Sequence, residues 1–423
     1  MKNYRLFLAF FISIFCITSQ ADALPRFALL RGDGNCLGCH VNPTGGQLRS
    51  AGGEAFSIND LPMWKRGDKF TSELSDGIRI GGDFRSQLLM FSQTSPLYSS
   101  IVEDSAIGRI KRGDTTRHLT SFHSMSLAFE LDIKATNTLH GFFRYDPLGL
   151  TQSEGWALLH FVHSSGEIIA SGKVVTNAYV KLGSFLPAFG IRFDDHTTYV
   201  KGGTASLSGF NHAGFFWTPG YRDVGAEIGT LLFDHIGIVA GMFNGLETTP
   251  IATFSTDPTK AYCFRLTSSG EIIENVLAGE LGFSEYIHNH PEGNMTLSAF
   301  HFSLRAGPVT ILSEYDMGKN IITSGGVTVA KANALCIEGA VNATKGLDAI
   351  LRYETFKNEN AAGQTGAQVK SRITIGAQWF PMRFLEIRPE YRIAATSIPN
   401  EFAQGLRDDI TENTFLVQTH VFF

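Results

Sequence analysis

Beyond its first residues, the sequence lacks any apolar run long enough to cross a bilayer as a helix. A transmembrane helix needs about 20 predominantly apolar residues, and the best stretch, residues 231–243, is broken by Asp234 and His235. Charge is also scarce: 35 basic and 40 acidic residues make up 18% of the chain, and no basic run occurs. This balance argues against a nucleic-acid partner, whose binding needs a clustered positive patch.

The first 23 residues have the pattern of an export signal. Lys2 and Arg5 form a positive start, residues 6–17 are apolar, and Ala21-Asp22-Ala23 is a small-residue cleavage site. The apolar run is short for a membrane anchor of about 20 residues. We therefore expect residues 1–23 to be a signal peptide and the mature protein to work outside the cytoplasm.

Several later segments alternate between apolar and polar residues with a period of two. In residues 124–133 (SMSLAFELDI), the odd positions are apolar, while Glu130 and Asp132 are among the even ones. Residues 347–356 and 385–392 alternate in the same way, with Arg and Glu on one face. Successive side chains of a strand point to opposite faces. A barrel with lipid outside and a wet lumen inside produces this pattern.

Segment length separates a membrane barrel from a soluble β-sandwich. Strands of soluble proteins average about 5–6 residues, whereas strands that cross a membrane need about 9–11. The alternating segments are long, and their connections are unequal: residues 134–138 form a tight turn, and residues 93–117 a long polar loop. Short turns at one end and long loops at the other are typical of outer-membrane barrels. We predict an all-β, antiparallel outer-membrane barrel of about 16 strands over residues 75–423.

Two further stretches carry a resemblance to known barrels. Residues 413–423 place Phe415, Val417, Val421 and Phe423 on one face and end in an aromatic residue. This resembles the terminal strand that barrel-assembly machinery recognises. Residues 178–200 look like parts of general porin-type barrels, which supports the architecture and identifies no substrate.

A Cys-x-x-Cys-His motif near the start of the mature chain predicts a cofactor. Cys36 and Cys39 have the spacing at which two thiols form thioethers with one haem, and His40 would ligate the iron. The alternatives are a small disulfide, half of a zinc site or a redox-active dithiol. No second C-x-x-C completes a zinc site, so we predict one covalent haem c.

The haem motif lies in a short segment, residues 24–74. About fifty residues are at or below the minimum for an ordinary independent core. We therefore expect this segment to sit as a plug in or at the periplasmic mouth of the barrel. Met63 is a possible distal iron ligand, and His140 of the lumen wall is an alternative; a five-coordinate iron also stays open.

Weaker constellations occur elsewhere. Asp194, Asp195 and His196 could bind a metal ion, as could His288, His290 and Glu292, although solvated loops or turns explain both. Cys263 and Cys336 fall on charged faces, where they are expected to form either a disulfide across the lumen or two free thiols.

Signal peptide, single haem motif and large barrel together resemble the fused outer-membrane cytochrome–porins. That resemblance implies that Cys36, Cys39 and His40 carry the haem. It also implies an electron-transfer protein between an extracellular redox donor or acceptor and a periplasmic carrier such as a c-type cytochrome. An extracellular ferrous-iron oxidase is one form of this activity. The alternative is a passive porin-like channel whose haem plug is structural or sensory.

Overall fold

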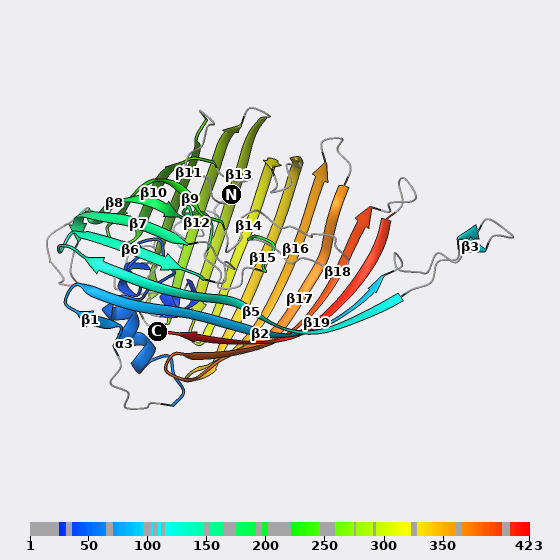
Figure 1. Ribbon diagram of the computed structural model, residues 1–423, viewed down its shortest axis with the longest axis horizontal. Helices are drawn as coiled ribbons and strands as arrows, with labels where there is room; N and C mark the ends of the chain where they lie inside the picture. Colours follow the sequence, from blue (N-terminus) through cyan, green and yellow to red (C-terminus); the bar gives the residue numbers. More distant parts are fainter. Residues whose placement is uncertain are drawn as a thin grey trace, which may run out of the picture.

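A closed barrel of sixteen strands forms most of the molecule (Figure 1). The computed structural model describes residues 25–30, 36–64, 71–95, 103–104, 109–110, 115–147, 153–163, 175–191, 197–201, 221–245, 259–274, 276–290, 293–322, 328–360, 365–399 and 407–423. The wall strands are β2 (Ile78–Ser95), β5 (Thr115–Lys134), β6 (Leu139–Tyr145), β7 (Glu154–His163), β8 (Val175–Phe185), β9 (Asp223–Leu232), β10 (Ile236–Phe243), β11 (Ala261–Ile273), β12 (Leu277–His290), β13 (Gly293–Ala306), β14 (Val309–Ile322), β15 (Thr328–Thr344), β16 (Leu347–Asn360), β17 (Thr365–Met382), β18 (Leu385–Pro399) and β19 (Arg407–Phe422).

Each strand pairs antiparallel with its neighbours, and the last strand closes on the first. Val417 of β19 lies opposite Leu88 of β2 in this closing pair. A short strand, β1 (Glu73–Ser75), extends the sheet beside β2, while β3 (Glu103–Asp104) and β4 (Arg109–Ile110) pair only with each other. Closure pairs the backbone groups of the wall, which a bilayer requires.

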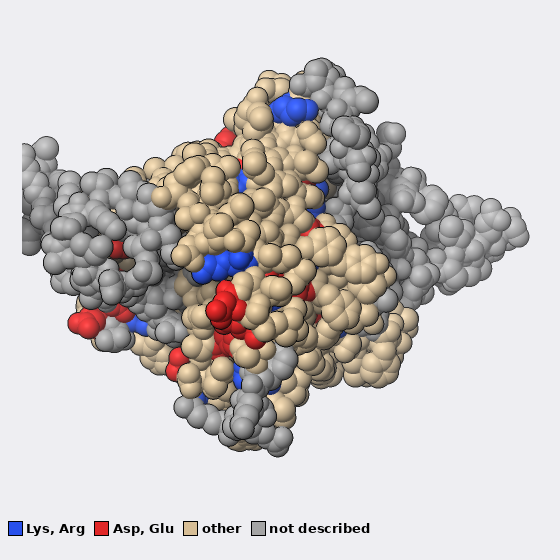
Figure 2. Space-filling view, turned by 60° about the vertical axis from the view of Figure 1, so that its left-hand side comes forward, with Lys and Arg blue, Asp and Glu red and all other residues tan. Residues whose placement is uncertain are grey.

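The two faces of the wall differ as the alternation predicts. On β13, Leu297 and Ala299 point inward and are buried, whereas Phe300 points outward and is 50% exposed. On β5, Glu130 and Asp132 are buried in the lumen, and Phe129 faces outward. Figure 2 shows one side of the molecule, where charged residues occupy only small areas of the described surface. The predicted outer-membrane barrel is confirmed.

The two ends of the barrel differ in their connections. Turns such as 307–308, 345–346 and 383–384 join strands at one end, and longer connections lie at the other. The C-terminal Phe423 lies at the turn end, where its backbone N–H donates to the carbonyl oxygen of Gly82 at 3.2 Å. Since short turns are periplasmic in such barrels, the turn end faces the periplasm.

The helices of the described residues are short and belong to the N-terminal part of the chain. They are α2 (Pro25–Leu30), the 3-10 turn η1 (Cys36–Gly38) and α3 (Ala51–Asn59). Figure 1 shows α3 at the same end as the C-terminus. None of the helices in the described part of the chain has the length and hydrophobicity that a membrane crossing needs.

Candidate functional site

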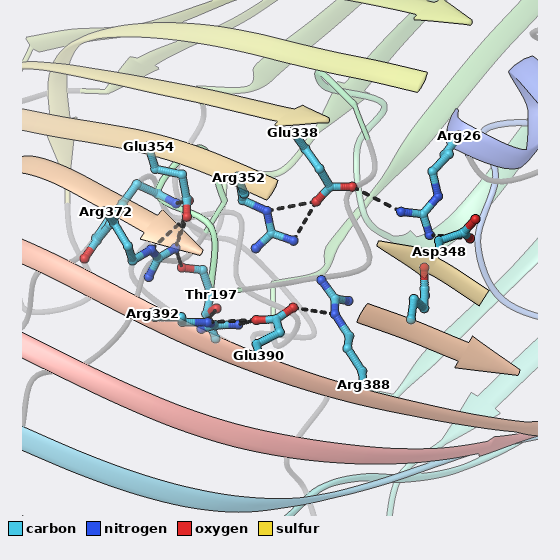
Figure 3. Close-up of polar contacts among 12 residues, drawn as sticks. Arg26, Thr197, Glu338, Asp348, Arg352, Glu354, Arg372, Arg388, Glu390 and Arg392 are labelled. Atoms are coloured by element: carbon cyan, nitrogen blue, oxygen red, sulfur yellow. Dashed lines mark hydrogen bonds and ion pairs between the residues drawn. The ribbon is translucent and has the colours of Figure 1, made fainter. Parts of the chain in front are cut away.

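A stripe of paired arginines and glutamates lines the inner wall from β15 to β18 (Figure 3). Because residues two apart share a face, Arg388, Glu390 and Arg392 of β18 all point inward. Arg388 and Arg392 donate to opposite oxygens of Glu390, at 2.5 and 2.9 Å. The other members are Glu338, Arg352, Glu354 and Arg372. We call these seven residues the arginine–glutamate stripe.

The pairs of the stripe join adjacent strands. Arg352 of β16 donates through two nitrogens to Glu338 of β15, at 2.9 and 2.7 Å. Arg372 of β17 donates to both carboxylate oxygens of Glu354, at 2.7 and 2.8 Å. Taking such charges out of water is costly unless they are paired with good geometry. The stripe therefore presents closely compensated charges of both signs rather than a field of one sign.

Described parts of the connection between β8 and β9 contact this stripe. We call these parts, residues 186–191 and 197–201, the inward segment. Arg372 and Arg392 donate to the carbonyl oxygen and the hydroxyl of Thr197, at 2.6 and 2.7 Å. The backbone N–H of Tyr199 donates to Glu354 at 3.1 Å, and the Arg372 guanidinium lies 4.2 Å from the centre of the Tyr199 ring. These contacts fix the segment against the wall opposite its own strands.

Glu314 of β14 holds both described parts of the inward segment. Its carboxylate accepts from the backbone N–H of Ile191 at 2.5 Å and from Lys201 Nζ at 2.7 Å. Gly190 precedes Ile191 with a φ of +59°, and a Cβ there would come within 2.2 Å of the Glu314 carboxylate. Only glycine meets both conditions without strain.

Residues 25–64, here called the N-terminal segment, also contact the inner wall. Arg26 of α2 lies 3.5 Å from Glu338 and 3.6 Å from Asp348. Leu29 packs with Leu312 and Ala278 of the wall and with Ile191 of the inward segment. The N-terminal and inward segments are therefore in contact with each other as well as with the barrel.

A tight turn at residues 42–47 carries the N-terminal segment to the opposite wall. Asn42 accepts from Thr44 through its side-chain oxygen, and Lys181 of β8 donates to Asn42 and Thr44 at 3.3 and 3.5 Å. Gln47 donates to Glu154 of β7. The side chains of the turn are thus hydrogen-bonded to buried residues of two strands, β7 and β8.

Helix α3 is fixed at the periplasmic end through Glu54. Ser50 caps the helix, and the Glu54 carboxylate accepts from Arg383 at 3.0 Å. It also accepts from the hydroxyl and backbone N–H of Ser72, at 2.9 and 3.2 Å, and lies 3.7 Å from Arg79. One carboxylate therefore joins α3 to the β17–β18 turn and to β2.

The Cys-x-x-Cys-His motif folds as a single tight turn. The backbone N–H of His40 donates to the carbonyl oxygen of Cys36 at 3.0 Å. Cys39 is buried against α3, where a Cβ at Gly53 would lie 2.1 Å from the Cys39 carbonyl oxygen. His40 Nδ1 lies 3.1 Å from the carbonyl oxygen of Gln47.

This donor set fits a covalent haem. Two thiols three residues apart suit the two thioethers, and a histidine whose Nδ1–H donates to a carbonyl presents Nε2 as the metal-binding nitrogen. Cys36, Cys39 and His40 would hold the group. The haem and its ligands stay a prediction.

The two expected sixth ligands lie on different parts of the molecule. The backbone N–H of Met63 donates to the carbonyl oxygen of Phe380 at 2.8 Å, which fixes Met63 at the β17–β18 turn. His140 lies on β6, with Nδ1 3.5 Å from Asp132 and its ring 5.8 Å from that of His160. The choice between Met63, His140 and an open iron stays a prediction.

The weaker motifs give no metal site in the described residues. Asp194, Asp195 and His196 lie outside them, as do Glu292 and the side chain of His290, whereas His288 is buried on β12. Across the described ranges, no three His, Cys, Asp or Glu side chains gather closely enough to hold a metal ion. Cys263 and Cys336 are buried and are not joined in a disulfide, which agrees with the expectation of two free thiols.

Sequence reasoning missed Glu314 and Lys181; Gly190 was expected only as a place where the backbone bends or packs closely. A signal existed for Glu314, because residues 309–317 alternate and put a carboxylate on the inward face of an otherwise ordinary strand. Nothing in the sequence indicates that its partners are Ile191 and Lys201, more than a hundred residues earlier.

Comparison with known proteins gives matches to solved structures alone. No protein-family model matches the sequence, and no curated protein does. OmpT of Vibrio cholerae is 12% identical, with a TM-score of 0.47, over 84% of this chain and 100% of that chain. OprB of Pseudomonas putida is 12% identical, with a TM-score of 0.49, over 86% of this chain and 100% of that chain. An anion-selective porin from Comamonas acidovorans is 12% identical, with a TM-score of 0.46, over 82% of this chain and 99% of that chain.

The chain has a porin-like outer-membrane barrel fold. This assignment rests on its own strand pairing, the sixteen-strand closure and the apolar outer face.

Proposed function

We propose that the protein is a diffusion channel for small polar solutes across the outer membrane. The observation that carries this proposal is the arginine–glutamate stripe, which lines the inner wall of a closed barrel and is hydrogen-bonded to the inward segment. A lumen lined with fixed charges and crossed by a chain segment is suited to filtering hydrated solutes. Because arginines and glutamates compensate each other along the stripe, we expect weak preference between anions and cations.

The N-terminal segment would narrow this channel from the periplasmic side. Its contacts reach β7 and β8 through Gln47 and Lys181, and β15 and β16 through Arg26. A segment held on opposite parts of the wall restricts the free cross-section between them. The channel is therefore expected to conduct less than an unobstructed barrel of the same strand number.

Planar-bilayer conductance and liposome swelling test the channel. The purified protein is expected to give discrete conductance steps and to admit small sugars into liposomes. A second preparation with Glu54→Gln and Arg26→Gln, which weakens both anchors of the N-terminal segment, is expected to conduct more. Folded protein, identified by heat-modifiable migration on a gel, that gives neither conductance nor swelling would contradict the proposal.

The second candidate is an electron-transfer role for a haem at Cys36, Cys39 and His40. The contact of His40 Nδ1 with the Gln47 carbonyl oxygen favours it, because ligand histidines are usually oriented in this way. When bound, the haem would supply one-electron oxidation and reduction. His40 would orient on its carbonyl partner, while the wall excludes lipid. This role needs a periplasmic carrier such as a c-type cytochrome. It also needs an extracellular redox donor, such as ferrous iron, or an extracellular acceptor.

Mass spectrometry of natively produced protein tests the cofactor separately from the channel. A peptide containing both cysteines is expected to carry one porphyrin through two thioethers, and Cys36→Ser with Cys39→Ser is expected to remove it. Stopped-flow oxidation or reduction by membrane-impermeant reagents would then report whether the haem exchanges electrons. Unmodified cysteines would remove the electron-transfer candidate and leave the channel proposal unaffected.

A further inference from the structure

Lysines gather on the outward face of the barrel near its extracellular end. Lys319 of β14 and Lys331 of β15 both point away from the lumen and are exposed. They are directly opposite each other in the register of the two strands. Lys357 of β16 follows on the next strand and is also outward. We call Lys319, Lys331 and Lys357 the lysine group.

The central pair is unfavourable as it stands. Side chains directly opposite on antiparallel strands have Cβ atoms about 4.5–5.5 Å apart, and like charges there destabilise the sheet. Within the described residues, neither Lys319 nor Lys331 makes an ion pair or a side-chain hydrogen bond. Glu359, which lies opposite Lys331, is engaged by Lys357 Nζ at 3.1 Å. An external anion placed between the two ammonium groups would remove the repulsion.

The position of the lysine group relative to the membrane determines which anions can reach it. Tyr315, Tyr353 and Tyr391 point outward on alternate strands and are 40%, 39% and 44% exposed. Outward tyrosines are enriched near the boundary between the hydrocarbon and the headgroups. On β14 the outward position between Tyr315 and Lys319 is Met317, which is apolar and 37% exposed, so the apolar face gives way to charge at Lys319. Lys319 lies four residues beyond Tyr315, or roughly 13 Å along the strand at about 3.3 Å per residue.

The lysine group therefore lies beyond the aromatic band, at the level of the outer-leaflet headgroups. It is on the lipid side of the wall, where a solute passing through the lumen does not reach it. Asn333, exposed and outward on β15, lies opposite Lys357 and adds a neutral donor. Lysine ammonium groups bind phosphate as compact point charges.

We propose that the lysine group is a docking surface for the phosphate groups of a glycolipid in the outer leaflet, with Lys319 and Lys331 sharing one phosphate. The glycolipid has the chemistry that the surface needs: sugar-linked phosphates held at headgroup height by acyl chains against the apolar wall. The proposal is independent of the channel and of the haem.

Native mass spectrometry of the purified barrel in detergent, titrated with bisphosphorylated lipid A, tests the docking surface. Lys319→Gln with Lys331→Gln is expected to weaken binding roughly tenfold or more, given about 1 kcal/mol for each lysine near a charged membrane surface. Lys319→Arg with Lys331→Arg keeps both charges and is expected to retain binding. Lys370→Gln is the matched control, because Lys370 is outward on β17 but already paired with Asp409 at 2.8 Å.

Four results would overturn the proposal. One is equal binding of lipid A by the folded glutamine variant, with folding judged by heat-modifiable migration. Another is equal binding of fully dephosphorylated lipid A by the wild-type protein. The third is complete displacement of lipid A by inorganic phosphate at matched phosphate concentration, which would indicate a site for the free anion. A changed oligomer mass with unchanged lipid binding would assign this face to a second copy and would also overturn it.

Discussion

Arg372 and Thr197 join the barrel wall to the inward segment: the guanidinium of Arg372 donates to the carbonyl oxygen of Thr197 at 2.6 Å. The same guanidinium donates to both carboxylate oxygens of Glu354 on the neighbouring strand. One side chain therefore does two separable things, pairing a buried carboxylate and holding a backbone that crosses the lumen.

The two roles of Arg372 can be separated by substitution. Arg372→Lys keeps a positive charge near Glu354 but lacks the planar guanidinium, which donates to Glu354 and Thr197 at the same time. We expect it to fold and to show higher, noisier single-channel conductance, because the segment near Thr197 is released. Arg372→Ala should add a stability loss of about 3–5 kcal/mol, since Glu354 loses its bidentate partner.

Bilayer recordings and urea unfolding of refolded protein measure the two effects. Lys370→Ala, an outward lysine two residues away, is the control and should change neither. Wild-type conductance in folded Arg372→Lys would mean that the Thr197 contact does not hold the segment.

Gly190 and Gly307 form a matched pair for testing the Glu314 anchor. Both have positive φ, +59° and +55°, so alanine is strained by about 1 kcal/mol at each. A Cβ at Gly190 collides with Glu314, whereas no atom of the described residues beyond its chain neighbours lies within 4 Å of one at Gly307. We expect Gly190→Ala to raise conductance and Gly307→Ala to leave it unchanged.

The same recordings decide the outcome, with heat-modifiable migration used to select folded protein. If both alanine variants give the same conductance, backbone strain alone accounts for any change in conductance. The carboxylate of Glu314 then does not position the inward segment.

His420 bridges two carboxylates where the barrel closes. Its Nδ1 lies 3.0 Å from Glu386 of β18, and its Nε2 lies 3.2 Å from Asp83 of β2. His420→Phe leaves the buried Glu386 and the half-buried Asp83 without this partner, and we expect the free energy of unfolding to fall by about 3–5 kcal/mol. His235→Phe is the comparison, because His235 contacts one backbone carbonyl oxygen and should cost about 1 kcal/mol.

Denaturant unfolding in detergent, followed by tryptophan fluorescence, gives both values. Equal losses in the two variants would show that the link between β18 and β2 contributes nothing beyond one hydrogen bond.

Glu54 should control how firmly the N-terminal segment is held. Glu54→Gln keeps the size of the side chain but removes the charge that Arg383 and Arg79 meet. We expect faster proteolytic removal of the N-terminal segment from the folded barrel, with the barrel itself intact. Glu73→Gln is the control, because Glu73 is more exposed and, among the residues that the structure describes, its carboxylate pairs with Arg79 alone. Equal cleavage rates in the two variants would rule out a special role for Glu54.

Much of the barrel could be predicted because the alternation that specifies each strand lies within that strand. Alternation at Glu130, Asp132, Arg388 and Glu390 fixes which face is inward, since every second side chain of a strand points the same way. Strand length and the unequal connections then favour a membrane barrel over a sandwich. Most of the stripe residues were recognisable as charges of the lumen, although Arg372 and the partners of all of them were not.

The pairings inside the lumen depend on where distant parts of the chain meet. Glu314 meets Ile191 and Lys201, and Arg26 meets Glu338, only because closure brings β14 and β15 to face the β8–β9 connection and the N-terminus. No period or motif encodes such contacts, which depend on barrel curvature and on the path of a segment without regular structure. The sequence by itself determined that the chain forms a two-faced β wall and carries a Cys-x-x-Cys-His motif. Only the tertiary structure decided what lies across the lumen, because closing a sheet into a cylinder makes neighbours of residues that are far apart along the chain.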